Sequence, residues 1–123
     1  MTTPPDKDVL FPLPPGFVAN DQREFCPECA EIWGVLAWYP AIKEGLDLRY
    51  VGLAQPRQEI CAFLGEGSWN APTLICGAQS TQPAGVRFQT RNGFSYLDTA
   101  REMAVYFAAL YGTPRPRGYA STK

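Results

Sequence analysis

Two cysteines separated by two residues are the strongest candidates for chemistry in this chain. Residues 25–30 read FCPECA, which places Cys26 and Cys29 in a Cys-x-x-Cys motif. Such a pair can cycle between dithiol and disulfide, can supply two of four zinc ligands, or can be two thiols with no shared role. The chain contains no histidine. A cysteine–histidine nucleophile pair and every histidine-containing zinc site are therefore excluded.

The remaining two cysteines help to rank these interpretations. A four-cysteine zinc site would need Cys61 and Cys76, but strong zinc signatures contain two Cys-x-x-Cys knuckles and this chain has one. Cys61 follows an isoleucine in a predicted helix, and Cys76 ends an apolar strand. We therefore expect both cysteines to be small core residues. A redox pair is the preferred interpretation. A pair with a binding or structural role and no turnover, and a small zinc-binding protein, remain the alternatives.

Composition limits the class of protein. With 123 residues and 46% hydrophobic content, the chain predicts one domain over 1–123, with a core at about 9–112 and a polar tail at 113–123. Lys and Arg number 11 against 12 Asp and Glu, without a run of like charges, so we expect no nucleic-acid partner and no membrane partner. No signal-peptide pattern or membrane span is apparent. We expect a cytoplasmic protein, whose thiols are kept reduced.

The first half of the chain predicts a strand, a long connection and a helix. Residues 9–11 form a short strand that PLPPG closes, and residues 14–25 read as an ordered loop in which Phe17 is an apolar anchor. A helix begins within the cysteine motif and stops before Pro40. Its apolar surface is wide, so we expect it to be well buried, with Trp33 and Trp38 in the core.

The second half predicts further strands and two helices. Residues 46–53 suggest a strand, and a short helix follows with Pro56 in its first turn and Gly65 as a left-handed cap. A strand opens after Pro72, and a hairpin turns at 92–93, where the chain reads Asn-Gly. The last helix has the clearest boundaries. Thr99 and Glu102 form a capping box before it, and Gly112 ends it.

This element order begins with a β-α-β unit and closes with antiparallel strands. Together with FCPEC at a helix start and APTLI opening a strand, it resembles the thioredoxin-like superfamily over roughly residues 9–112. Within it, the chain is most similar to a family of small bacterial thioredoxin-like proteins catalogued as a domain of unknown function. The resemblance implies an α/β fold of thioredoxin or glutaredoxin type, a three-layer sandwich whose mixed four-stranded sheet has helices on both faces.

The resemblance also implies where substrate binds. The matching proline of the superfamily is cis and faces the cysteine motif, which assigns that place to Pro72. Substrate-binding positions are expected at Ala71, Pro72, Thr73, Pro27, Trp69 and Asp98. Two features depart from the superfamily: residues 14–25 separate the first strand from the motif, and no buried carboxylate is apparent on that strand, since Asp8 precedes it.

The two thiols have different predicted roles. Cys26 at a helix N-terminus is the expected attacking nucleophile, because unpaired N–H groups favour a thiolate there, and Cys29, on the apolar face, is the buried resolving thiol with the higher pKa. Glu28, together with Glu24 and Glu31, adds negative charge that opposes the helix dipole. We therefore expect a reducing couple, at about −270 to −200 mV.

The expected partner is a protein or small-molecule thiol or disulfide. No metal and no cofactor is predicted, and glutathione is the one candidate co-substrate. If it is the electron donor, the superfamily implies that its backbone runs along Pro72 and that its γ-glutamyl group lies at Asp98 and Thr99. We expect a monomer or a weak dimer.

Overall fold

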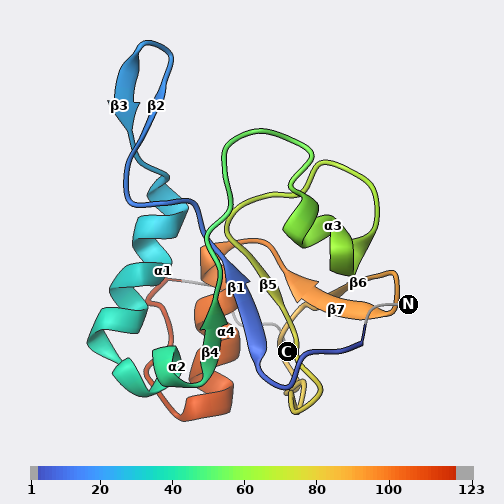
Figure 1. Cartoon of the computed structure of the whole chain (residues 1–123). Coiled ribbons are helices and arrows are strands. Elements are labelled where there is room, and N and C mark those ends of the chain that lie inside the picture. The colour runs from blue at the N-terminus through green and yellow to red at the C-terminus, as the bar shows by residue number, and fades with distance from the viewer. Residues whose placement is uncertain (1–2, 119–123) are drawn as a thin grey trace.

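The computed structural model describes residues 3–118 and contains a five-stranded mixed sheet with helices on both of its faces (Figure 1). In chain order the elements are β1 (Asp8–Phe11), β2 (Phe17–Ala19), β3 (Gln22–Glu24), α1 (Pro27–Trp38), α2 (Pro40–Glu44), β4 (Leu46–Leu48), α3 (Gln58–Leu64), β5 (Thr73–Ile75), β6 (Gln89–Arg91), β7 (Phe94–Leu97) and α4 (Ala100–Tyr111). No helix within residues 3–118 has the length and apolar character that crossing a membrane requires.

The strand order in the sheet is β4-β1-β5-β7-β6. Strands β1 and β4 are parallel, and the other neighbouring pairs are antiparallel. The expectation of four strands is wrong, because β6 adds a fifth at the edge. It is the first arm of the predicted hairpin, which is confirmed: Asn92 and Gly93 have φ of 55° and 83°, as a two-residue hairpin turn requires.

Alternation along β1 divides the core between the two faces of the sheet. Val9 and Phe11 pack in one cluster with residues of α3, whereas Leu10 packs in a second cluster with residues of α1, α2 and α4. This is the period-two pattern of a strand that is buried on both faces. Because β1 is an inner strand of the sheet and Leu13, just beyond its end, lies beside Cys29, both clusters fix the position of the chain from which the site is built.

The last helix starts and ends where its capping residues predict. The Thr99 hydroxyl accepts a hydrogen bond from the Glu102 N–H at 3.2 Å, and Gly112 is left-handed with φ 72°. The same helix packs against α1 across one face of the sheet. Its N-terminus therefore has a defined position relative to the N-terminus of α1.

The segment between the first strand and the motif is a hairpin, and the expectation of a loop over 14–25 is wrong. Strands β2 and β3 pair with each other outside the main sheet, and Figure 1 shows them projecting from the body next to the start of α1. Asn20 and Asp21 turn the chain with φ of 54° and 60°, the geometry of a tight hairpin turn. Phe17 is partly buried against the core, as its predicted role as an anchor requires.

The predicted strand over 46–53 is shorter than expected. Beyond Leu48 the chain still runs beside the end of β1, since the Arg49 N–H donates to the Leu10 carbonyl and the Val51 N–H donates to the Pro12 carbonyl. Pro12 has no N–H to return a bond, so the regular ladder cannot continue past it.

In the short helix, Gly65 is the C-cap as predicted, but its expected left-handed conformation and the expected place of Pro56 in the first turn are wrong. Pro56 follows a cis peptide bond and precedes α3, which begins at Gln58. Gly65 has φ 88° and ψ −178°, which is not a left-handed helical cap.

Helix α1 is less buried than its composition predicts. Its buried residues are Cys29, Ile32 and Leu36, whereas the side chain of Trp38 is 79% exposed. These three residues lie on one face of the helix, the face that meets the sheet and α4, and the rest of the helix surface is not covered. Pro40 ends α1, as predicted, and also starts α2, which the sequence did not indicate.

Candidate thiol site

Cys26 is the N-cap of α1. Its backbone is extended, with φ −82° and ψ 114°, and its Sγ accepts a hydrogen bond from the Cys29 N–H at 3.2 Å. Pro27 occupies the first helical turn, where a missing N–H leaves nothing unsatisfied. The half-buried Cys26 sulfur therefore lies at the positive end of the helix dipole, facing an N–H group of the first turn.

The segment before β5 faces this sulfur from the other side. The Ala71–Pro72 peptide bond is cis, as the resemblance implied, and the Cys26 thiol approaches the Ala71 carbonyl oxygen at 3.7 Å as a weak donor. The side chains of Ala71, Pro72 and Thr73 are buried. The segment therefore presents little accessible surface beside Cys26.

Cys29 is in a very different environment. It is 4% exposed, and its Sγ accepts a hydrogen bond from the Leu13 N–H at 3.4 Å. Burial, and secondarily the hydrogen bond with the Cys26 side chain, raise the pKa of Cys29 to about 12. At neutral pH Cys29 is thus a protonated thiol, while the neighbouring Cys26 is the more accessible of the two.

An apolar pocket of about 260 Å³ adjoins both sulfurs. None of the residues that line it is charged, and they come from the segment after β1, the base of the hairpin and α1: Leu13, Pro14, Pro15, Phe25, Cys26, Cys29, Ala30 and Trp33. Phe25, one of the lining residues, is 61% exposed. Sequence reasoning missed this pocket; the signal available was the run PLPP, which ends β1 and turns the chain toward the motif.

Glu28, inside the motif, reaches across to another helix. Its Oε1 accepts a hydrogen bond from the Ala100 N–H, the first of α4, at 3.0 Å. One turn further along α1, Glu31 accepts a hydrogen bond from Arg101 Nε at 2.7 Å. Of the causes that raise the pKa of Cys29, the charge of Glu28 is the smallest. The carboxylate thus lies at the N-terminus of α4, a contact between residues 72 positions apart that the sequence did not indicate.

None of the six expected substrate-binding residues lines this pocket. Trp69 packs edge-on against Tyr96 at 5.9 Å, and its indole N–H donates to the Gly65 carbonyl. It contacts the same core cluster as Cys29 without lining the pocket. Asp98 precedes the cap of α4, and its Oδ1 accepts a hydrogen bond from Gln89 at 2.8 Å.

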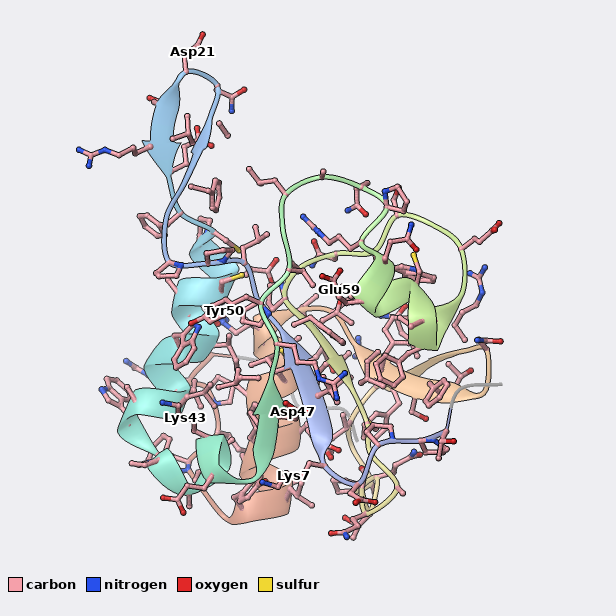
Figure 2. All side chains as sticks on the ribbon, in the orientation of Figure 1. Lys7, Asp21, Lys43, Asp47, Tyr50 and Glu59 are labelled. Carbon is pink, nitrogen blue, oxygen red and sulfur yellow. The ribbon has the colours of Figure 1, made fainter. Side chains whose placement is uncertain are left out.

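Asp8 is buried and belongs to β1, not to the segment before it. Its carboxylate accepts hydrogen bonds from the Gly77 N–H and from the Tyr106 hydroxyl. In Figure 2, Lys7, which precedes it, lies at the opposite end of the molecule from Asp21 at the hairpin tip. Asp8 is therefore a buried carboxylate at the end of β1 remote from the cysteine motif.

The other two cysteines do not join the pair. Cys61 lies on α3 with its thiol directed to the Gly67 carbonyl, at 3.6 Å. Cys76 is buried after β5, and burial together with the charge of Asp8 raises its pKa to about 12. Over residues 3–118, no three cysteine or carboxylate side chains gather where they could hold one metal ion. The four cysteines therefore do not converge on a common site.

Comparison with known proteins identifies a family for most of the chain. A family model described as a protein of unknown function, DUF3088, covers residues 7–115. No curated protein and no solved structure matches the chain. The matched segment includes all the strands and helices, the cysteine pair and the cis-proline segment. The chain belongs to the DUF3088 family.

Proposed function

We propose that this protein is a thiol–disulfide oxidoreductase with a thioredoxin-like fold, in which Cys26 attacks and Cys29 resolves. One observation carries the proposal: the two thiols of one motif are unequal. Cys26 caps α1 beside the carbonyl of a cis X-Pro bond, whereas Cys29 is buried with a pKa of about 12. A more accessible nucleophile and a buried partner are what stepwise thiol–disulfide exchange uses.

The topology supports the fold assignment. Strand β1 is parallel to β4 and antiparallel to β5, which is antiparallel to β7. The motif begins the helix that follows the first strand of the sheet, and the cis proline immediately precedes β5. This is the combination of element order, motif position and proline position on which the resemblance was based. The β2–β3 hairpin and β6 are additions to that plan.

The proposed reaction has two exchange steps. The Cys26 thiolate attacks one sulfur of a substrate disulfide, the substrate S–S bond breaks, and the leaving sulfur takes up a proton. Cys29 then loses its proton and attacks Cys26 in the mixed disulfide, releasing the second substrate thiol. The pair is oxidised to a disulfide by two electrons, and the substrate disulfide is reduced to two thiols.

The environment of Cys29 changes between these steps. Cys26 raises the pKa of Cys29 through the hydrogen bond between their side chains and through its charge. Once Cys26 is part of a mixed disulfide, it carries no charge, and its sulfur is a weaker acceptor for the Cys29 S–H than a thiolate is. The pKa of Cys29 is then lower than in the reduced pair, which makes the resolving thiol easier to deprotonate when it is needed.

The direct test is disulfide turnover by the purified protein. Insulin reduction with dithiothreitol as the electron source should be accelerated by the wild type and by Cys61→Ser, the matched control outside the pair. It should be lost with Cys26→Ser. The proposal fails if the wild type shows no acceleration, or if Cys26→Ser retains it. A protein that binds thiols without turnover would give the first of these results.

A further inference from the structure

The N-terminus of α4 is a position for a negatively charged group next to the cysteine pair. Helix N-termini favour anions, because their first N–H groups have no partner within the helix and the dipole is positive there. Here the Ala100 N–H is already bonded to a carboxylate of the chain itself, Glu28 Oε1, at 3.0 Å. The Glu102 N–H is bonded to the Thr99 hydroxyl. An anionic ligand that binds the Ala100 N–H would therefore have to displace Glu28, which lies between the two cysteines in the sequence.

The surroundings of the sulfurs offer little else to an anion. The 260 Å³ pocket beside them has no charged lining residue. The nearest guanidinium along α4, that of Arg101, is paired with Glu31 at 2.7 Å. A tripeptide thiol with two carboxylates would thus meet the carboxylate of Glu28 and an apolar surface. An uncharged peptide segment with an apolar side chain would meet a pocket that it can fill.

We propose that Glu28 is a specificity residue: by occupying the N-terminus of α4, it disfavours anionic disulfides such as oxidised glutathione and directs the cysteine pair to disulfides in apolar peptide segments. This inference rests on the proposed function. The chemistry is the exchange already given, with the two thiols of the reduced pair as the electron source, so single-turnover reduction needs no further reductant.

The experiment compares two substrates with reduced protein in single turnover. One is oxidised glutathione, and the other is a cystine peptide with blocked termini and leucine flanks, which has no net charge. Samples are quenched with acid, and the Cys26–Cys29 disulfide is quantified by peptide mapping. The wild type should favour the neutral peptide, by about tenfold or more relative to the ratio shown by dithiothreitol, which has no binding site. Salt should accelerate only the glutathione reaction, since it screens like-charge repulsion.

Substitutions at Glu28 distinguish two effects of this residue: its hydrogen bond to the Ala100 N–H and its negative charge. Glu28→Ala frees the Ala100 N–H and should accelerate the glutathione reaction by about twofold to fivefold relative to the neutral-peptide reaction, the range expected for one carboxylate at a helix N-terminus. Glu28→Gln keeps an acceptor oxygen for that N–H and should give a smaller gain. Glu24→Gln is the control for general charge. Its carboxylate bonds within the hairpin, to Asn20 and Gln22, and its gain should be below that of Glu28→Ala.

The outcomes distinguish this inference from the proposed function. If the wild type reduces neither disulfide, the proposed function fails and the inference with it. If the wild type reduces both without preference, the function stands and the inference is wrong. If Glu28→Ala slows both reactions equally, Glu28 only holds α1 against α4. If Glu24→Gln and Glu28→Ala accelerate the glutathione reaction equally, the effect comes from the overall charge of the protein. Either result overturns the inference. If Glu28→Ala does not fold, Glu28→Gln decides.

Discussion

The rate at which Cys29 is alkylated can be predicted from its environment. Its pKa is about 12, compared with 9.0 for an unperturbed cysteine. Because the thiolate fraction falls tenfold for each pH unit below the pKa, about one Cys29 in 10⁴ is a thiolate at about pH 8, against about one in ten for a free cysteine. Because a more basic thiolate is also intrinsically more reactive, alkylation of Cys29 in the folded, reduced protein should be slower by about 30-fold to 100-fold, before its 4% exposure reduces access further.

The assay is pulsed iodoacetamide labelling followed by peptide mass spectrometry. Rates at Cys26 and Cys29 are compared with an unstructured cysteine peptide, and the same protein in urea serves as the control in which both sites should label alike. Cys29 should gain about tenfold in rate for each pH unit up to about pH 11. In Cys26→Ala, which removes two of the causes that raise its pKa, Cys29 should label faster than in the wild type. Labelling of folded Cys29 within about tenfold of the free peptide would refute this reasoning.

Three further predictions concern stability. Tyr106→Phe should lower the free energy of unfolding by about 1–3 kcal/mol, because it removes a donor from the buried carboxylate of Asp8; a change below about 0.5 kcal/mol in urea denaturation would contradict this. Thr99→Ala should cost about 0.5–2 kcal/mol by removing the cap of α4, while Thr99→Ser should stay close to the wild type; thermal unfolding checks this, and equal losses in both variants would argue against the cap. The folded-state pKa of Cys76 is raised, from 9.0 to about 12, so its contribution to stability is fully present below about pH 9 and is lost as the pH rises from there towards about 12. Urea unfolding between about pH 8 and 11 should thus show falling stability, with a shallower fall in Cys76→Ala; stability that rises over that range would have the wrong sign.

The elements with local signals were predictable from sequence. The last helix begins and ends where Thr99 and Gly112 indicate, because a hydroxyl cap and a left-handed glycine act within one helical turn. The Asn92–Gly93 hairpin is confirmed for the same reason. The start of α1 at the cysteine motif, with Cys29 buried, also followed from local spacing.

Features that depend on long-range packing were not predictable in this way. Strands β2 and β3 have three residues each, so any alternation in them is too short to indicate pairing, and only the turn residues Asn20 and Asp21 gave a signal. The contact of Glu28 with the N-terminus of α4 joins residues 72 positions apart. The sequence could place a charge in the motif, but it could not show which helix the charge faces.

The exposure of Trp38 also depends on long-range packing that the sequence does not show. Composition alone predicts burial for an aromatic residue in an apolar helix, yet α1 meets the rest of the protein along one stripe, and Trp38 lies outside it. The apolar pocket beside the sulfurs combines residues from three separate segments. Which apolar residues form a core and which form a pocket is decided by how those segments meet.

Trapping of the mixed disulfide tests the central claim most directly. Reduced wild type and Cys29→Ser are each treated with an excess of a small neutral disulfide, quenched with acid and mapped by mass spectrometry. We expect a persistent adduct on Cys26 in Cys29→Ser, and an internal Cys26–Cys29 disulfide with both substrate thiols released in the wild type. A wild-type protein that keeps its adduct, or one that forms it first on Cys61, would contradict the assignment of Cys26 as the attacking thiol and Cys29 as the resolving thiol.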